Sequence, residues 1–353
     1  SGGVQNVCVG DESGTTISTG DNNVGVGYAA LDANSTGSNN IGIGSNALGV
    51  NTTAHNNVAV GYHALAVNLT GTQNIAVGYS ALATNTTANS NIAIGTNALA
   101  VNTIGDTNTV VGENVMASNI EGSKNSAFGY AALDADTYGN QSTAFGYAAL
   151  SAQNFASSTP SQNTAIGHNA GAGITTGTNN SLIGAHAGDA LTDADNNVAV
   201  GYFALSDDTL GSRTTAIGKG ALENQNFESA TNTHNTAVGY SAGNKITTGA
   251  NNTLIGALAG DVLTDADNNV AVGRTALSAD TQGSGSVAIG YDALVVQNLT
   301  SAAVSYNTAV GYVAGRSITT GVNNTILGGL AGDALTDADY NTAIGRSALG
   351  ADT

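Results

Sequence analysis

The chain has 353 residues, among them 48 Gly, one Pro, one Cys and no Trp, and only 9% of its residues are charged. Its net charge of −18 would repel the phosphates of nucleic acids and of membrane surfaces, so we expect neither as a partner. No apolar run approaches the roughly 18 residues that span a bilayer, so no membrane insertion is expected. Cys8 has no second cysteine with which to form a disulfide or a thiolate metal site.

A glycine recurs at regular intervals along the chain and defines 20 repeat units. Each is a 17-residue unit, except that three units are longer by four positions. We call these residues the motif glycines: Gly10, Gly27, Gly44, Gly61, Gly78, Gly95, Gly112, Gly129, Gly146, Gly167, Gly184, Gly201, Gly218, Gly239, Gly256, Gly273, Gly290, Gly311, Gly328 and Gly345. Such a fixed period is the signature of a repeat architecture.

The residues before each motif glycine predict one short strand per unit, from the segment before Gly10 to the segment before Gly345. The residue directly before the glycine is large and apolar in all 20 units, the next is mostly Ala, and the third is Val, Ile, Thr or Ser. The fourth is Asn in 17 units. Small residues alternating with β-branched ones between Asn and Gly are typical of a strand.

The spacing divides the chain into two regions. Residues 1–150 consist of uniform 17-residue units, whereas residues 151–353 continue with a 72-residue super-repeat of four units. Each super-repeat contains one four-residue lengthening, within 151–162, 223–234 and 295–306. The second region is therefore expected to continue the same fold with periodic loops.

These units predict an all-β fold, a parallel β-solenoid of about 20 coils with one coil per 17-residue repeat. No helical apolar stripe is present, and the unit is too short for leucine-rich or helical repeats. Gly is expected to supply the positive φ of a tight corner, and the Asn to adopt a left-handed conformation. We expect Val and Ile to fill the coil and the Ala side of the strand to pack against copies of the chain in a closed oligomer.

Segments such as Asn57–Leu65, Asn74–Asn91 and Asn307–Gly315 resemble the head repeats of YadA-type trimeric autotransporter adhesins, and also the repeats of bacterial and phage tail-fibre proteins. The resemblance implies a left-handed, homotrimeric β-roll located outside the cell, on a cell surface or on a virion. Two features depart from the adhesins: the 17-residue coils are longer, and the insertions recur regularly. With no anchor, stalk or chaperone domain in the chain, we expect a segment of a longer fibre.

Three acidic segments are candidate calcium sites, because alternating carboxylates are hard oxygen donors. The candidate ligands are Asp193, Asp195, Asp265, Asp267, Asp337 and Asp339. No EF-hand or nonapeptide calcium motif accompanies them, and a solvated acidic turn explains the same residues. No other cofactor is expected.

The insertions are candidate receptor-binding loops, because insertions in repeat proteins map to one face that often binds a partner. Their candidate residues are Asn154, Phe155, Asn226, Phe227, Asn298 and Leu299. The alternative is that the aromatic and leucine side chains fold back over the enlarged coil. Nine of the 12 Tyr directly follow a motif glycine, which favours a structural ladder over a platform for sugar rings.

The predicted function is that of a structural and adhesive fibre segment, which attaches to a host glycan or protein receptor through many weak contacts. An ice- or crystal-binding solenoid with Thr ladders is the alternative. A third hypothesis is a tailspike-like glycan hydrolase, which needs two carboxylates across a groove. The acidic residues repeat with the solenoid instead of forming one unique site, and no nucleophile motif is present, so no enzymatic activity is expected.

Overall fold

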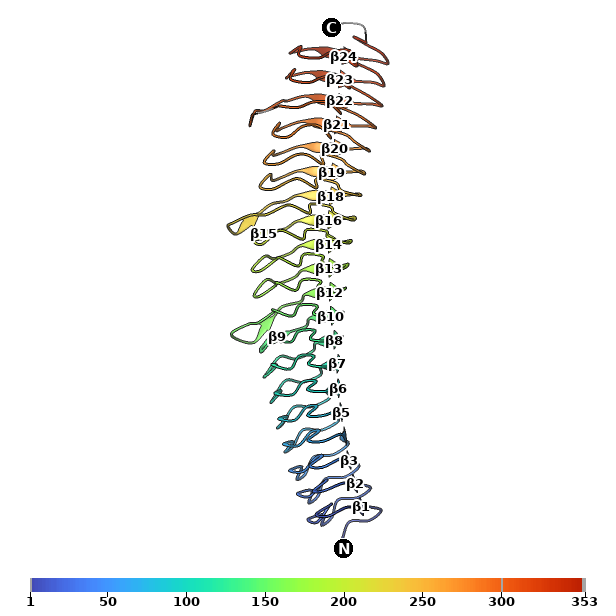
Figure 1. Ribbon diagram of the computed structural model, residues 1–353, viewed down its shortest axis with the longest axis vertical. Helices are drawn as coiled ribbons and strands as arrows, with labels where there is room; N and C mark the ends of the chain where they lie inside the picture. The colour runs from blue at the N-terminus through green and yellow to red at the C-terminus, as the bar shows by residue number, and fades with distance from the viewer. Residues whose placement is uncertain (1, 300, 351–353) are drawn as a thin grey trace. The chain divides into compact units, whose positions relative to one another are not determined.

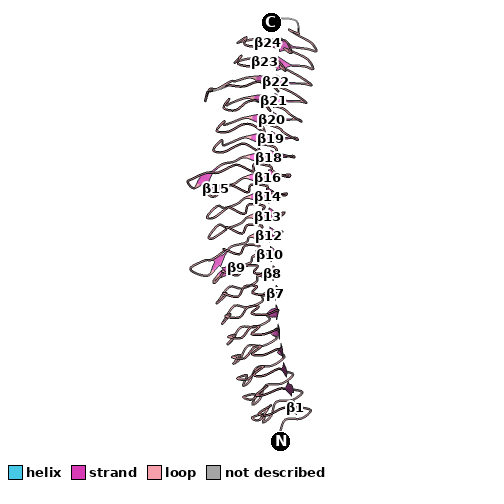
Figure 2. Ribbon diagram, viewed as in Figure 1, coloured by secondary structure: helices cyan, strands magenta, loops and turns pink. Residues whose placement is uncertain are grey.

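The computed structural model describes residues 2–299 and 301–350, which divide into two compact units, a first that extends to Thr178 and a second that begins at Asn179. Each unit is a stack of parallel coils, and the described residues contain strands, turns and loops but no helix (Figures 1 and 2). Accordingly, no helix in these residues is long and apolar enough to cross a membrane. The predicted all-β solenoid of about 20 coils is confirmed. The first insertion, 151–162, belongs to the first unit, so the unit boundary does not coincide with the start of the super-repeat.

In the first unit, one three-residue strand precedes each motif glycine. These strands are β1 (Val7–Val9), β2 (Val24–Val26), β3 (Ile41–Ile43), β4 (Val58–Val60), β5 (Ile75–Val77), β6 (Ile92–Ile94), β7 (Thr109–Val111), β8 (Ser126–Phe128), β10 (Thr143–Phe145) and β12 (Thr164–Ile166). Two shorter strands, β9 (Gly139–Asn140) and β11 (Thr159–Pro160), pair with each other at the first insertion.

The second unit repeats this arrangement. Its strands are β13 (Ser181–Ile183), β14 (Val198–Val200), β16 (Thr215–Ile217), β18 (Thr236–Val238), β19 (Thr253–Ile255), β20 (Val270–Val272), β21 (Val287–Ile289), β22 (Thr308–Val310), β23 (Thr325–Leu327) and β24 (Thr342–Ile344). At the second insertion β15 (Gly211–Ser212) pairs with β17 (Thr231–Asn232), and at the third Ser284 forms a single bridge to Val304.

Within each unit the coils stack in the register of the repeat. Ala59 in β4 lies opposite Ala76 in β5, its equivalent in the next coil, and Thr143 in β10 lies opposite Thr164 in β12, its equivalent beyond the first insertion. Equivalent residues therefore form columns that run from coil to coil. The turns stack as well, since the Leu48 N–H donates to the Ala64 carbonyl at 3.1 Å.

The motif glycine is required at its corner for two reasons. Gly61 has a φ of +140°, a conformation that residues with a side chain rarely adopt. In addition, a Cβ on Gly61 would lie 2.3 Å from the carbonyl oxygen of Gly78 in the next coil. The corner therefore needs glycine both for its backbone angle and for the close approach of neighbouring coils.

The two faces of the strand are the reverse of the prediction. In β4, Ala59 is fully buried inside the coil, while Val58 and Val60 point outward and are half-buried. In every three-residue strand of the described chain except β1, the central residue is buried and its two neighbours are half-buried or exposed. In β1 the central Cys8 is also exposed. Leu48 and its equivalents after the motif glycine already fill the interior, so only a small residue fits opposite them.

The Asn before each strand also differs from the prediction. Asn57 is fully buried, and the left-handed conformation belongs to the preceding Asn56, whose φ is +59°. The Asn57 backbone N–H donates to Oδ1 of Asn40 one coil before at 3.0 Å, and its Nδ2 donates to the Gly71 carbonyl at 2.9 Å. This Asn is therefore an internal link between coils.

In each coil one of two columns carries the large apolar side chain that fills the interior. The fourth residue after the motif glycine is usually a buried Leu, and the seventh is then polar. In seven coils the fourth is Gly and the seventh is Ile or Leu instead: Gly14 with Ile17, Gly171 with Ile174, Gly188 with Leu191, Gly243 with Ile246, Gly260 with Leu263, Gly315 with Ile318, and Gly332 with Leu335. Packing at constant volume explains this pairing.

Candidate functional site

An apolar ladder covers the outer face of the strands in each unit. It consists of the first and third residues of every three-residue strand, which we call the outer ladder. Among the described strands the third residue is always apolar, whereas the first is Val or Ile in nine strands and Thr or Ser in eleven. Its Ile43 and Ile94 remain 39% exposed, and Phe128 stacks on Phe145 with ring centroids 4.4 Å apart. Contiguous exposed apolar surface of this kind commonly marks an interaction site. The outer ladder is thus the leading candidate for contact with another chain.

The insertions extend beyond the neighbouring coils, as the loops at β9 and β15 show in their respective units (Figure 1). Each insertion pairs in parallel with the coil before it, through Thr159 on Gly139 in the first and Thr231 on Gly211 in the second. The base of each of these two loops is therefore held by backbone hydrogen bonds, and residues 156–158 and 228–230 face solvent.

The candidate receptor-binding residues fall into two groups. Phe155, Phe227 and Leu299 are buried, with 5–7% of each residue exposed, and so fold back over the coil as the alternative hypothesis holds. Asn154 and Asn226 are exposed and Asn298 is half-buried. The Oδ1 atoms of the three Asn accept from the hydroxyls of Thr137, Thr209 and Thr281 at 2.7–3.1 Å.

A buried carboxylate lies beneath each insertion, and the sequence interpretation missed it. Asp208 is fully buried, and its Oδ2 accepts from Nε2 of Gln225 in the next coil at 2.5 Å. Its Oδ1 accepts from the backbone N–H groups of Gly211 at 3.0 Å and Phe227 at 3.2 Å. Burial raises the pKa of Asp208, although these donors oppose the shift.

The same arrangement recurs in the other two insertions, with Asp136 on Gln153 and Asp280 on Gln297. The sequence carries a signal for it. The three units in which Ser or Thr replaces the Asn before the strand are those directly before an insertion, and these hydroxyls join the clusters: Ser142, Thr214 and Ser286.

The acidic segments lie on turns at the surface. Asp193, Asp265, Asp337 and Asp339 are exposed, while Asp195 and Asp267 are half-buried. One carboxylate oxygen of Asp267 accepts from the Ala250 N–H at 2.7 Å, and Asp339 accepts from the Val322 N–H at 2.7 Å. Over residues 2–299 and 301–350, no three His, Cys, Asp or Glu side chains come together as a metal site. Calcium binding stays a prediction.

The tyrosines after the motif glycine stack on one another. Tyr62 lies on Tyr79 and Tyr130 on Tyr147, each with ring centroids 5.3 Å apart and planes within 14° of parallel. One face of each ring is therefore covered by a neighbouring ring, while each of the four Tyr stays 46–54% exposed. This geometry favours a structural ladder over a stacking platform for sugars.

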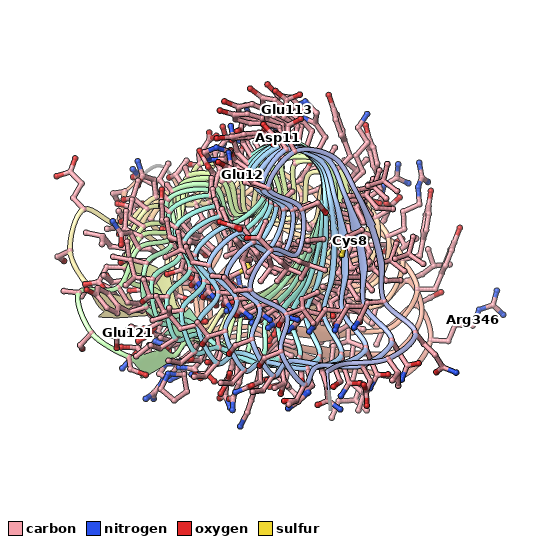
Figure 3. All side chains as sticks on the ribbon, turned by 90° about the horizontal axis from the view of Figure 1, so that it is seen from below. Cys8, Asp11, Glu12, Glu113, Glu121 and Arg346 are labelled. Carbon is pink, nitrogen blue, oxygen red and sulfur yellow. The ribbon has the colours of Figure 1, made fainter. Side chains whose placement is uncertain are left out.

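Charged side chains project from the outside of the coils. Seen along the first unit, Asp11, Glu12 and Glu113 point away from the coils at one corner, and Glu121 lies on another side (Figure 3). All four of these acidic residues are exposed. Comparisons with protein-family models, with curated proteins and with solved structures give no match for this chain.

Proposed function

We propose that this chain is a segment of an extracellular fibre, a homotrimer whose three solenoids pack through the outer ladder. The observation that carries the proposal is the apolar row formed by the third strand residues along each unit, all of which are half-buried or exposed. A chain that kept this row in water would expose a continuous apolar surface, and a closed ring of identical chains removes it.

The proposed function is attachment to a host glycan or protein receptor. The insertions recur at a fixed interval in the sequence, so three chains would present several identical loops on one fibre. Weak contacts then add up to strong attachment, because each further contact forms at a high effective concentration. The acidic turns of each chain, with its net charge of −18, would keep such fibres from associating side by side. The proposal includes no catalytic activity, and release of reducing sugars from bacterial polysaccharides would overturn that part.

Charge substitutions on the outer ladder test both parts of the proposal. Ile43→Asp with Ile94→Asp places carboxylates in the proposed interface, and Thr70→Asp with Thr87→Asp adds the same charge at exposed turns. We expect the first pair to yield monomers that bind labelled host cells at least tenfold more weakly, and the second pair to bind as the unmodified chain does. Equal binding by all three proteins contradicts the proposal.

A second candidate, binding to ice or another crystal surface, has one observation in its favour. Thr236, Thr253 and Thr308 lie on the outer ladder beside Val and Ile, in register from coil to coil. This candidate requires the same face to be free in solution, so the two functions exclude each other. Thermal hysteresis of the purified chain would support it and count against the trimer.

A further inference from the structure

A ladder of side-chain amides runs through six consecutive coils of the first unit, at the seventh residue after the motif glycines from Gly27 to Gly112. All of its side chains are fully buried, and from Asn51 on each Nδ2 donates to Oδ1 of the Asn one coil before, at 2.7–3.1 Å. The ladder consists of Asn34, Asn51, Asn68, Asn85, Asn102 and Asn119.

The ladder ends at an acceptor without a donor. Asn119 Oδ1 is buried and has no hydrogen-bond partner. In every earlier coil of the ladder this atom accepts from the equivalent residue of the next coil, and here that residue is Asp136. An ionised carboxylate has no proton to donate, so two acceptors would face each other inside the coil.

Turning the Asn119 amide over does not remove the conflict. Its Nδ2 donates both to Asn102 Oδ1 at 2.7 Å and to the Gly122 carbonyl in its own turn at 3.1 Å. A reversed amide would place Oδ1 against both of these oxygens. The carbonyl in each turn thus fixes the direction of the ladder, and the missing proton has to come from Asp136.

Asp136 has no positive charge to balance an ionised state. Gln153 donates to Oδ2 at 2.6 Å and the Gly139 N–H to Oδ1 at 2.9 Å, while burial raises the pKa of the carboxyl. The side chains that face it from the coils on either side are the amides of Asn119 and Gln153, neither of which titrates. The ionisable residues along these turns are Asp134 and Tyr138, which are half-buried, and Glu121, which is exposed, and none of them carries a positive charge.

We propose that Asp136 is a proton-binding site, a neutral carboxylic acid whose O–H donates to Asn119 Oδ1 and completes the amide ladder beneath the first insertion. Loss of this proton leaves the two acceptors opposed at the base of the loop. The first insertion, residues 151–162, then becomes less firmly held in alkaline solution.

The matched control is Asp208, which occupies the same column, is equally buried and accepts from an equivalent Gln at 2.5 Å. One coil before it lies the fully buried Leu191, which offers no acceptor. The protonated form of Asp208 therefore lacks the hydrogen bond that we propose for Asp136. Asp136 should hold its proton to a higher pH than Asp208.

Carbon-13 NMR of the full chain with labelled aspartate carboxyls measures this directly, and Asp136→Asn and Asp208→Asn assign the two signals. We expect the Asp136 signal to be that of a protonated carboxyl at neutral pH and to titrate above the Asp208 signal. An Asp136 that is ionised at neutral pH, or that titrates at or below Asp208, overturns the proposal.

Urea unfolding of Asp136→Asn gives an independent readout. The new amide nitrogen can donate to Asn119 Oδ1 at every pH, but it replaces an oxygen that accepts from the Gly139 N–H or from Gln153 Nε2. We therefore expect the unfolding midpoint of the variant to rise relative to that of the unmodified chain as the pH increases from neutral to alkaline. A difference between the two midpoints that stays constant from neutral to alkaline pH contradicts the proposed donor role.

Discussion

A Cβ on Gly188 would lie 2.8 Å from Cδ1 of Leu191, so these two positions share one space inside the coil. Leu182 closes the same space, with its Cδ2 2.9 Å from that Cβ. In coils with Leu at the fourth position, such as Leu205, the seventh residue is the polar Asp208. The large side chain therefore lies at either the fourth or the seventh position, and the interior of the coil is filled in both cases.

Gly188→Leu should overfill this coil and lower the free energy of unfolding by about 1–3 kcal/mol. Leu191→Ala should leave a cavity and cost about 2–5 kcal/mol. We expect the double variant to lose less than the two single losses combined, because one side chain occupies the space that the other vacates. Urea denaturation of the four proteins measures this coupling, and additive losses would show that the positions are independent.

Gly78→Ala tests the corner of the coil. Its φ is +141°, and a Cβ would lie 2.3 Å from the Gly95 carbonyl oxygen, so we expect a loss of about 3 kcal/mol or more from strain and separated coils. Hydrogen exchange should accelerate for amides of the coils on either side. The matched control is Gly49→Ala, where the nearest heavy atom would lie 3.4 Å from the new Cβ. Equal protection of these amides from hydrogen exchange in both variants would contradict the close approach of the corners.

Asn57→Ala tests the internal amide links. The buried Asn74 N–H loses its acceptor Asn57 Oδ1, and the Gly71 carbonyl loses its donor Asn57 Nδ2, each at 2.9 Å. We expect each unpaired group to lower the free energy of unfolding by about 1–3 kcal/mol. The neighbouring Asn56 is exposed with positive φ, so Asn56→Gly should be close to neutral. Thermal unfolding distinguishes the two variants, and similar melting temperatures would count against these internal amide links between coils.

Asp208 should make the free energy of unfolding depend on pH. Burial raises the pKa of this carboxyl in the folded chain above the ordinary value of 3.8, so the folded state keeps a proton that the unfolded state releases. The free energy of unfolding therefore falls as the pH rises from 3.8 through the raised value. Asp208→Asn removes this contribution. A constant difference between the two proteins across a pH series of urea titrations would refute the assignment.

The sequence predicts the repeat, the parallel solenoid and the position of nearly every strand, because Gly and Asn recur at fixed distances from each one. It does not predict which side of the strand faces inward. Alternating small and large residues usually place the large ones inside, whereas here Leu48 and its equivalents occupy the interior and leave room only for residues such as Ala59. The exchange between the fourth and seventh positions was visible in the sequence and would have located this interior.

The candidate site was predicted less well than the fold. The insertions were located, yet Phe155 and Phe227 are buried because an enlarged coil needs an apolar cover. The carboxylates beneath the loops were missed because Asp136 and Asp208 look like any acidic turn residue when they are considered alone. Only their stacking with Gln153 and Gln225, one coil on, identifies them as internal.

The proposed trimer is the central claim, and the mass of the unmodified chain in solution tests it most directly. Sedimentation equilibrium should give three times the 34.6 kDa chain mass at micromolar concentration, with no dependence on salt if the apolar outer ladder forms the contact. A species of 34.6 kDa at all concentrations would contradict the account, since the outer ladder would then remain exposed to water.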